Sequence, residues 1–147
     1  MNNEASAIIE GLQKLGESDF DYTNRGAKGD ARLDSICEAV IKLPDPTRIF
    51  PEFFRLMERL SEADLGAPGP LVHTMERHIG FYEALLMESI HRKPTYLSVW
   101  MVNRILNGNA ANRDTWMNIL RVAADHPLAS EGVKDSALGF IQLQNEN

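Results

Sequence analysis

The stretch TYLSVWMVNRIL, residues 95–106, is apolar on nearly every side of a helix drawn through it. Such a helix is normally covered by neighbours on more than one side. Pro94 precedes the stretch and Gly108 follows it, and both residue types mark helix ends. We therefore expect a central buried helix, in which Asn103 anchors a neighbouring loop by hydrogen bonds and Arg104 pairs with an acid across helices.

The helical period continues on the C-terminal side of this stretch. One more apolar stripe ends at His126-Pro127, and Ser130 is a suitable N-cap for a last helix. The residues expected to face inward in these two helices are Trp116, Ile119, Leu120, Ala123, Val133, Ala137, Phe140 and Ile141. The polar tail from Gln144 to Asn147 is expected to fray.

Five apolar stripes with helical spacing precede residue 95. They occupy residues 5–15, 33–41, 53–60, 71–75 and 82–90. Proline and glycine separate them: Pro70 is placed as the first residue of one helix, and Gly80 as the break after it. No stretch alternates between apolar and polar residues as a strand would.

These elements predict an all-α protein of about eight short antiparallel helices, in a single domain over residues 1–147. Two arrangements fit the pattern. Helix pairs can stack as a HEAT-like α-solenoid, which the spacing of one helix pair between Pro94 and Pro127 suits. A compact irregular bundle also fits, because the repeats do not align clearly with one another.

Composition predicts a folded cytoplasmic protein. Hydrophobic residues make up 44% of the chain, which is too many for a disordered protein. No apolar run approaches the ~18 residues of a membrane span, and the polar, acidic N-terminus lacks the features of a secretory signal. The single cysteine, Cys37, cannot form an internal disulfide, which fits a reducing compartment. We expect no contact with a membrane.

The distribution of charge indicates that a charged binding surface, if present, lies in the first half of the chain. The net charge of −6 argues against direct binding of nucleic acid, which depends on neutralising phosphates. Residues 1–64 hold thirteen acidic and eight basic side chains, whereas residues 65–147 hold eight and seven. The one long link, residues 16–29, places Phe20 and Tyr22 among acids. Links of this length are often functional, and local packing onto the first helices is the alternative.

A search for reactive chemistry finds no catalytic set, no metal site and no cofactor site. Cys37 lies on the apolar stripe of its helix and is interpreted as a buried structural thiol. His73 and Glu76 share a helix face, but no second pair completes a metal site. Phosphate-binding, dinucleotide-binding and nucleophile-elbow motifs are absent from the sequence. We therefore expect a binding protein and not an enzyme.

Three segments carry a resemblance to a known family. They are DLGAPGPLVH at residues 64–73, RKPT at 92–95 with VWMVNRILN at 99–107, and HPLAS at 126–130. Together they resemble the helical immunity proteins of bacterial polymorphic-toxin systems, including those of contact-dependent growth inhibition. The resemblance covers roughly residues 60–135 and concerns caps and core residues, while the first 60 residues match only in character.

The resemblance implies a cytoplasmic protein that binds and neutralises a cognate toxin domain as a 1:1 heterodimer. Toxins of these systems are often nucleases with basic surfaces, so we expect occlusion of the active or substrate-binding surface of a nuclease, with a ribonuclease favoured. An acidic protein suits such a partner because charge complementarity speeds association. The toxin-contacting surface of the family varies, so no contact residue is carried over from it.

Toxin-binding residues are therefore nominated from this sequence alone. We select acids in or near the acidic half, together with one aromatic anchor. They are Asp19, Asp21, Tyr22, Glu62, Asp64, Glu76 and Glu83. Two other classes of function stay open: a general HEAT-like scaffold or adaptor without a toxin partner, and, more remotely, a metal-dependent hydrolase built in a helical bundle.

Overall fold

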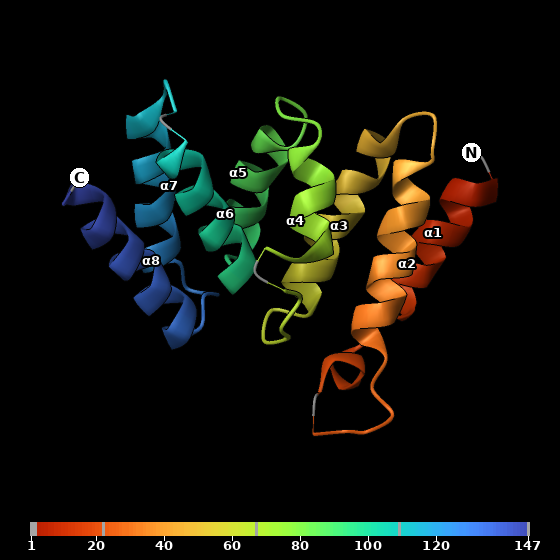
Figure 1. Ribbon diagram of the computed structural model, residues 1–147. Helices are drawn as coiled ribbons and strands as arrows, with labels where there is room; N and C mark the ends of the chain where they lie inside the picture. Colours follow the sequence, from red (N-terminus) through yellow and green to blue (C-terminus); the bar gives the residue numbers. More distant parts are fainter. Residues whose placement is uncertain (1–2, 22, 67, 109, 147) are drawn as a thin grey trace. The chain divides into compact units, whose positions relative to one another are not determined.

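The computed structural model describes residues 3–21, 23–66, 68–108 and 110–146, and all regular structure in these ranges is helical (Figure 1). They contain eight α-helices and two short 3-10 helices, and no strand. The predicted all-α class with about eight short helices is therefore confirmed. No helix in the described ranges combines the length and the apolar character needed to cross a membrane.

The chain divides into two compact units, Met1–Leu85 and Leu86–Asn147, and the division falls within α5 (Glu83–Arg92). Each unit is described by itself. The expectation of one domain over residues 1–147, and the choice between an α-solenoid and an irregular bundle, therefore stay predictions.

Unit 1 (Met1–Leu85) contains paired helices around an aromatic core. Its elements before α5 are α1 (Asn3–Lys14), η1 (Glu17–Phe20), α2 (Gly29–Ile41), η2 (Pro46–Ile49), α3 (Phe50–Arg59) and α4 (Gly69–Glu76). α1 packs against α2 and α3, and α2 packs against α4. Phe50, Phe53 and Phe54 are fully buried, and the rings of Phe50 and Phe53 stack with centroids 5.9 Å apart. Burial of such rings is a main source of core stability.

An arginine on α3 closes the end of α1. The guanidinium of Arg59 donates to the backbone oxygen of Leu15 over 2.6 Å and to that of Leu12 over 3.0 Å. The last carbonyls of a helix have no partner within the helix and carry partial negative charge, so a cation there satisfies and stabilises them. This contact joins residues 44 and 47 positions apart and was not predicted from the sequence.

Unit 2 (Leu86–Asn147) is built from the rest of α5 with α6 (Tyr96–Asn107), α7 (Arg113–Asp125) and α8 (Glu131–Asn145). α6, α7 and α8 all pack against one another. α6 is buried on several sides, as its apolar composition predicted. Ser130 is the N-cap of α8 and accepts a hydrogen bond from the Val133 N–H, which confirms the N-cap that the sequence predicted.

The expectation of a frayed tail is wrong at Gln144. This residue lies in the last turn of α8 and is only 1% exposed. Its Nε2 donates to the Oδ1 atoms of Asn103 and Asn107, each over 2.7 Å. Arg113 donates to the Gln144 Oε1 over 3.1 Å and to its backbone oxygen over 2.8 Å. Asn103 is thus a structural anchor, as predicted, but it holds the end of a helix instead of a loop.

Some side chains of unit 2 are less buried than the helical pattern predicted. Trp100, Phe140 and Ile141 are half-buried. The guanidinium carbon of Arg104 lies 4.9 Å from the centroid of the Trp100 ring, so this cation covers an aromatic face that would otherwise be more exposed.

Cys37 on α2 is 3% exposed, which confirms the interpretation as a buried thiol. Burial raises the pKa of Cys37 to about 11; the Thr74 hydroxyl opposes this rise and the charge of Asp34 adds to it. The reactive species is the thiolate, which at pH 8 is then roughly one molecule in a thousand. We expect the folded protein to resist Ellman's reagent at pH 8 and to react at once when unfolded in guanidinium. Fast reaction of the folded protein would contradict this.

Candidate functional site

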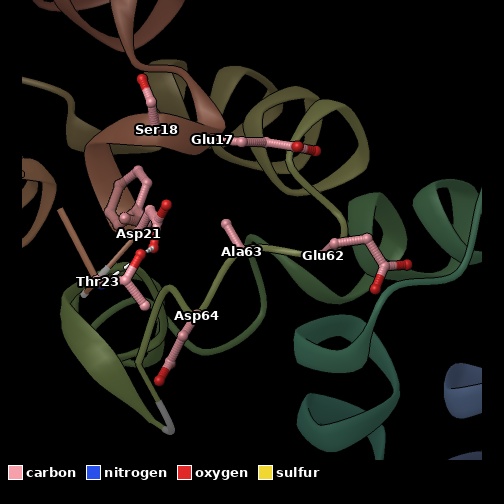
Figure 2. A pocket seen from close by; sticks show the side chains of 8 residues that line it. Glu17, Ser18, Asp21, Thr23, Glu62, Ala63 and Asp64 are labelled. Carbon is pink, nitrogen blue, oxygen red and sulfur yellow. Dashed lines mark hydrogen bonds between the residues drawn. The ribbon is translucent and has the colours of Figure 1, made fainter.

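Acidic side chains surround a hollow of about 670 Å³ on the surface of unit 1 (Figure 2). We call it the acidic hollow, and its lining residues are Glu17, Ser18, Phe20, Asp21, Thr23, Glu62, Ala63 and Asp64. Four of the eight are carboxylates and none is basic. Two segments far apart in the sequence thus form one negatively charged depression.

The first wall is η1 and the residues that follow it. Asp19 accepts a hydrogen bond from the Gly16 N–H at its Oδ2 over 2.8 Å, which caps η1, and its Oδ1 lies 3.5 Å from the guanidinium of Arg32. Phe20 is buried and anchors the segment to unit 1. The part of the 16–29 link around Phe20 therefore packs locally, as one of the two alternatives predicted, and this packing places Glu17 and Asp21 at the hollow.

η1 lies directly against the start of α2. A Cβ atom added to Gly29, the first residue of α2, would lie 2.5 Å from the backbone oxygen of Asp19 and 2.8 Å from the Phe20 ring. Real Cβ atoms do not approach other atoms so closely, so only glycine allows η1 to approach α2 in this way. The first wall of the hollow therefore depends on a residue that does not line it.

The second wall follows α3. Leu60 and Leu65 are buried on either side of it and fix residues 62–64 to the core. Asp64 accepts a hydrogen bond from the Gly66 N–H over 3.0 Å, and Gly66 has a φ of 98°, which favours glycine. Glu62 and Asp64 are both exposed, and Figure 2 shows their carboxylates pointing away from each other.

Asp21 is held in its charged form. The Thr23 hydroxyl donates to the Asp21 Oδ1 over 2.6 Å, and the Thr23 N–H donates to the same oxygen over 3.0 Å. These bonds, the hydroxyl first, lower the pKa of Asp21 below its ordinary value because they stabilise the carboxylate. The hollow therefore keeps this negative charge to lower pH than a free aspartate would.

The structure brings together three of the seven nominated residues: Asp21, Glu62 and Asp64. Asp19 lies in the same segment, but its carboxylate holds η1 and Arg32. Tyr22 lies outside the described residues. Glu17 also lines the hollow and was missed, although its position in the acidic link was a signal that could have found it.

The remaining two nominated residues lie outside the hollow. Glu76 is the last residue of α4, and Glu83 is the first residue of α5. Glu83 accepts hydrogen bonds from the N–H groups of Gly80 and Tyr82, so its carboxylate organises the loop before α5.

The described lining of the acidic hollow carries several separate negative charges. The hollow offers carboxylates and two hydroxyls, and its carboxylates do not converge on a single point in Figure 2. No group of three or more His, Cys, Asp or Glu side chains in the described ranges is arranged to hold a metal ion. Such a surface can attract and pair with several cations of a partner.

The whole negative balance of the chain lies in the unit that carries the hollow. Unit 1 contains 15 acidic and nine basic side chains, a net charge of −6, and unit 2 contains six of each. Charge of one sign around a depression strengthens the field there and steers oppositely charged partners.

Comparisons with protein-family models, with curated proteins and with solved structures find no match to this chain.

Proposed function

We propose that this protein is an immunity protein that binds and neutralises a cognate toxin domain in the bacterial cytoplasm. The toxin is a basic nuclease, with a ribonuclease favoured, and the complex contains one copy of each protein. The acidic hollow is the observation that carries the proposal, because it identifies a surface suited to a basic partner. The resemblance of the three sequence segments to immunity proteins is the reason for proposing a toxin as the partner.

A nuclease must expose a positively charged surface to hold its substrate. An enzyme that holds nucleic acid neutralises phosphates with lysine and arginine, so its substrate-binding surface is positive. Four carboxylates around one hollow are complementary to such a surface and compete with the substrate for the same cations. A protein bound there blocks the substrate without any chemistry of its own.

Removal of charge from the acidic hollow tests this proposal. In the site variant Glu17 and Glu62 become glutamine and Asp21 and Asp64 become asparagine, so an amide oxygen remains to accept the Thr23 and Gly66 hydrogen bonds. We expect association with the toxin domain encoded directly upstream, in a catalytically inactive form, to slow by about 10- to 100-fold at low salt. Stopped-flow fluorescence at several salt concentrations measures this rate.

The matched control removes the same number of charges from exposed acids of unit 2. Its substitutions are Glu88→Gln, Asp125→Asn, Asp135→Asn and Glu146→Gln. We expect the control to slow association by no more than about threefold, because these acids do not line the acidic hollow and exposed charges outside the contact are screened by salt. Equal slowing in both variants would mean that only net charge matters and would reject the acidic hollow as the binding surface. A partner that is basic but not a toxin would instead favour the adaptor alternative.

A further inference from the structure

Two large apolar residues, two positions apart in the sequence, are exposed in the turn before α5. Ile79 is 76% exposed and Phe81 is 64% exposed, and only Gly80 separates them. We call residues 79–81 the apolar tip. Single exposed apolar residues are common on soluble proteins, whereas adjacent ones often mark a contact with another molecule.

The apolar tip is held in one conformation by its surroundings. Both carboxylate oxygens of Glu83 accept from the Gly80 N–H, each over 2.9 Å, and one of them accepts from the Tyr82 N–H over 3.1 Å. Gly80 has a φ of 100°, which favours glycine. Tyr82 is buried, so the chain is anchored directly after Phe81.

The residue before the tip is also fixed. The His78 ring meets the buried Phe50 ring edge to face, with centroids 5.8 Å apart. The tip is therefore anchored at both ends while its two apolar side chains point into solvent. A loop that is already ordered loses little entropy on binding, so the contacts it makes count more fully toward affinity.

The size and charge of this region limit what it can bind. Two side chains cover far less than the roughly 800 Å² per partner of a standard interface, so the tip alone does not make a stable dimer of this chain. A lipid surface with anionic headgroups repels unit 1, whose net charge is −6. A concave apolar pocket on a protein suits the tip best, because buried aromatic anchors dominate many protein interfaces.

We infer that the apolar tip inserts Ile79 and Phe81 into an apolar pocket on the toxin domain, an inference that rests on the proposed function. The acidic hollow and the tip lie at opposite ends of α4, since Asp64 precedes this helix and Ile79 follows it (Figure 1). α4 has eight residues and is therefore about 12 Å long. The hollow attracts the basic partner and the tip holds it, so loss of the tip acts mainly on dissociation.

The test replaces Ile79 and Phe81 by serine and measures affinity for the inactive toxin domain encoded directly upstream, by calorimetry. We expect affinity to fall by about 100-fold or more, mostly through faster dissociation, while unfolding in urea is nearly unchanged. The matched control replaces Leu128 and Leu138, which are 60% and 55% exposed in unit 2, by serine. We expect its affinity to stay within about threefold of the original protein.

The other outcomes separate this inference from the function it rests on. Equal affinity of the tip variant and the original protein overturns the tip and leaves the proposed function standing. Absence of binding by the original protein overturns both. Sedimentation with vesicles of phosphatidylcholine and phosphatidylglycerol, or a concentration-dependent dimer, overturns the protein-pocket assignment if the serine substitutions at Ile79 and Phe81 abolish it.

Discussion

Replacement of Gln144 by alanine is expected to lower the free energy of unfolding by about 2–4 kcal/mol, because it removes a buried donor from Asn103 and one of the two hydrogen bonds that Arg113 makes to Gln144. The Oδ1 of Asn103 loses its donor, and the guanidinium of Arg113 loses the side-chain oxygen of Gln144. Desolvated groups that lose a partner cost more than the bond itself contributed. Urea unfolding followed by circular dichroism measures the change.

Gln142→Ala provides the matched control, because Gln142 lies on the same helix and is exposed. We expect this variant to stay within about 0.5 kcal/mol of the original protein. The difference between the two variants isolates the role of the buried amide from the helix propensity of alanine. Equal stability of both variants would contradict the assignment of Gln144 as the residue that joins α6, α7 and α8.

The second large effect is expected for Gly29→Ala. The added Cβ would meet the backbone oxygen of Asp19, which cannot turn aside as a flexible side chain can, so η1 must move away from α2. Overpacking of this kind costs about 1–3 kcal/mol. We also expect faster hydrogen exchange at the Gly16 amide, since the Asp19 carboxylate that protects it belongs to the displaced segment. Mass spectrometry of exchanged peptides measures this locally.

Gly26→Ala is the control for this substitution. Gly26 lies in the same link and is exposed, and an added Cβ would have only an ordinary contact, 3.5 Å from the Asn24 side chain. We expect a change in stability within about 0.5 kcal/mol. If Gly29→Ala were as stable as Gly26→Ala and exchanged no faster, the close approach of η1 to α2 would be refuted.

Much of the helical organisation could be predicted because its signals are local. Ser130 caps α8 through a residue three positions away, and Gly80 lies in the turn between α4 and α5 with a φ of 100°. Such features need no knowledge of the rest of the fold. The burial of the helix over residues 95–106 could likewise be predicted, because its side chains are apolar on nearly every side.

The features that could not be predicted depend on residues far apart in the sequence. Gln144 looks like part of a polar tail until Asn103, 41 positions away, is placed beside it. The acidic hollow likewise joins Asp21 to Asp64 through the packing of η1, which no periodicity encodes. In sequence, an acid that binds a partner cannot be distinguished from an acid that accepts hydrogen bonds from its own loop, so Glu83 was nominated as a contact. The spacing of three residues between Gly80 and Glu83 is a signal for the second role.

The most direct test of the proposed function is a titration of this protein into an inactive form of its proposed toxin, taken as the product of the gene directly upstream, at low and at physiological salt. We predict a 1:1 complex whose association slows as salt increases, together with rescue of cell growth when the active toxin and this protein are produced in one cell. Absence of binding, or binding that does not depend on salt and does not restore growth, would contradict the proposed function.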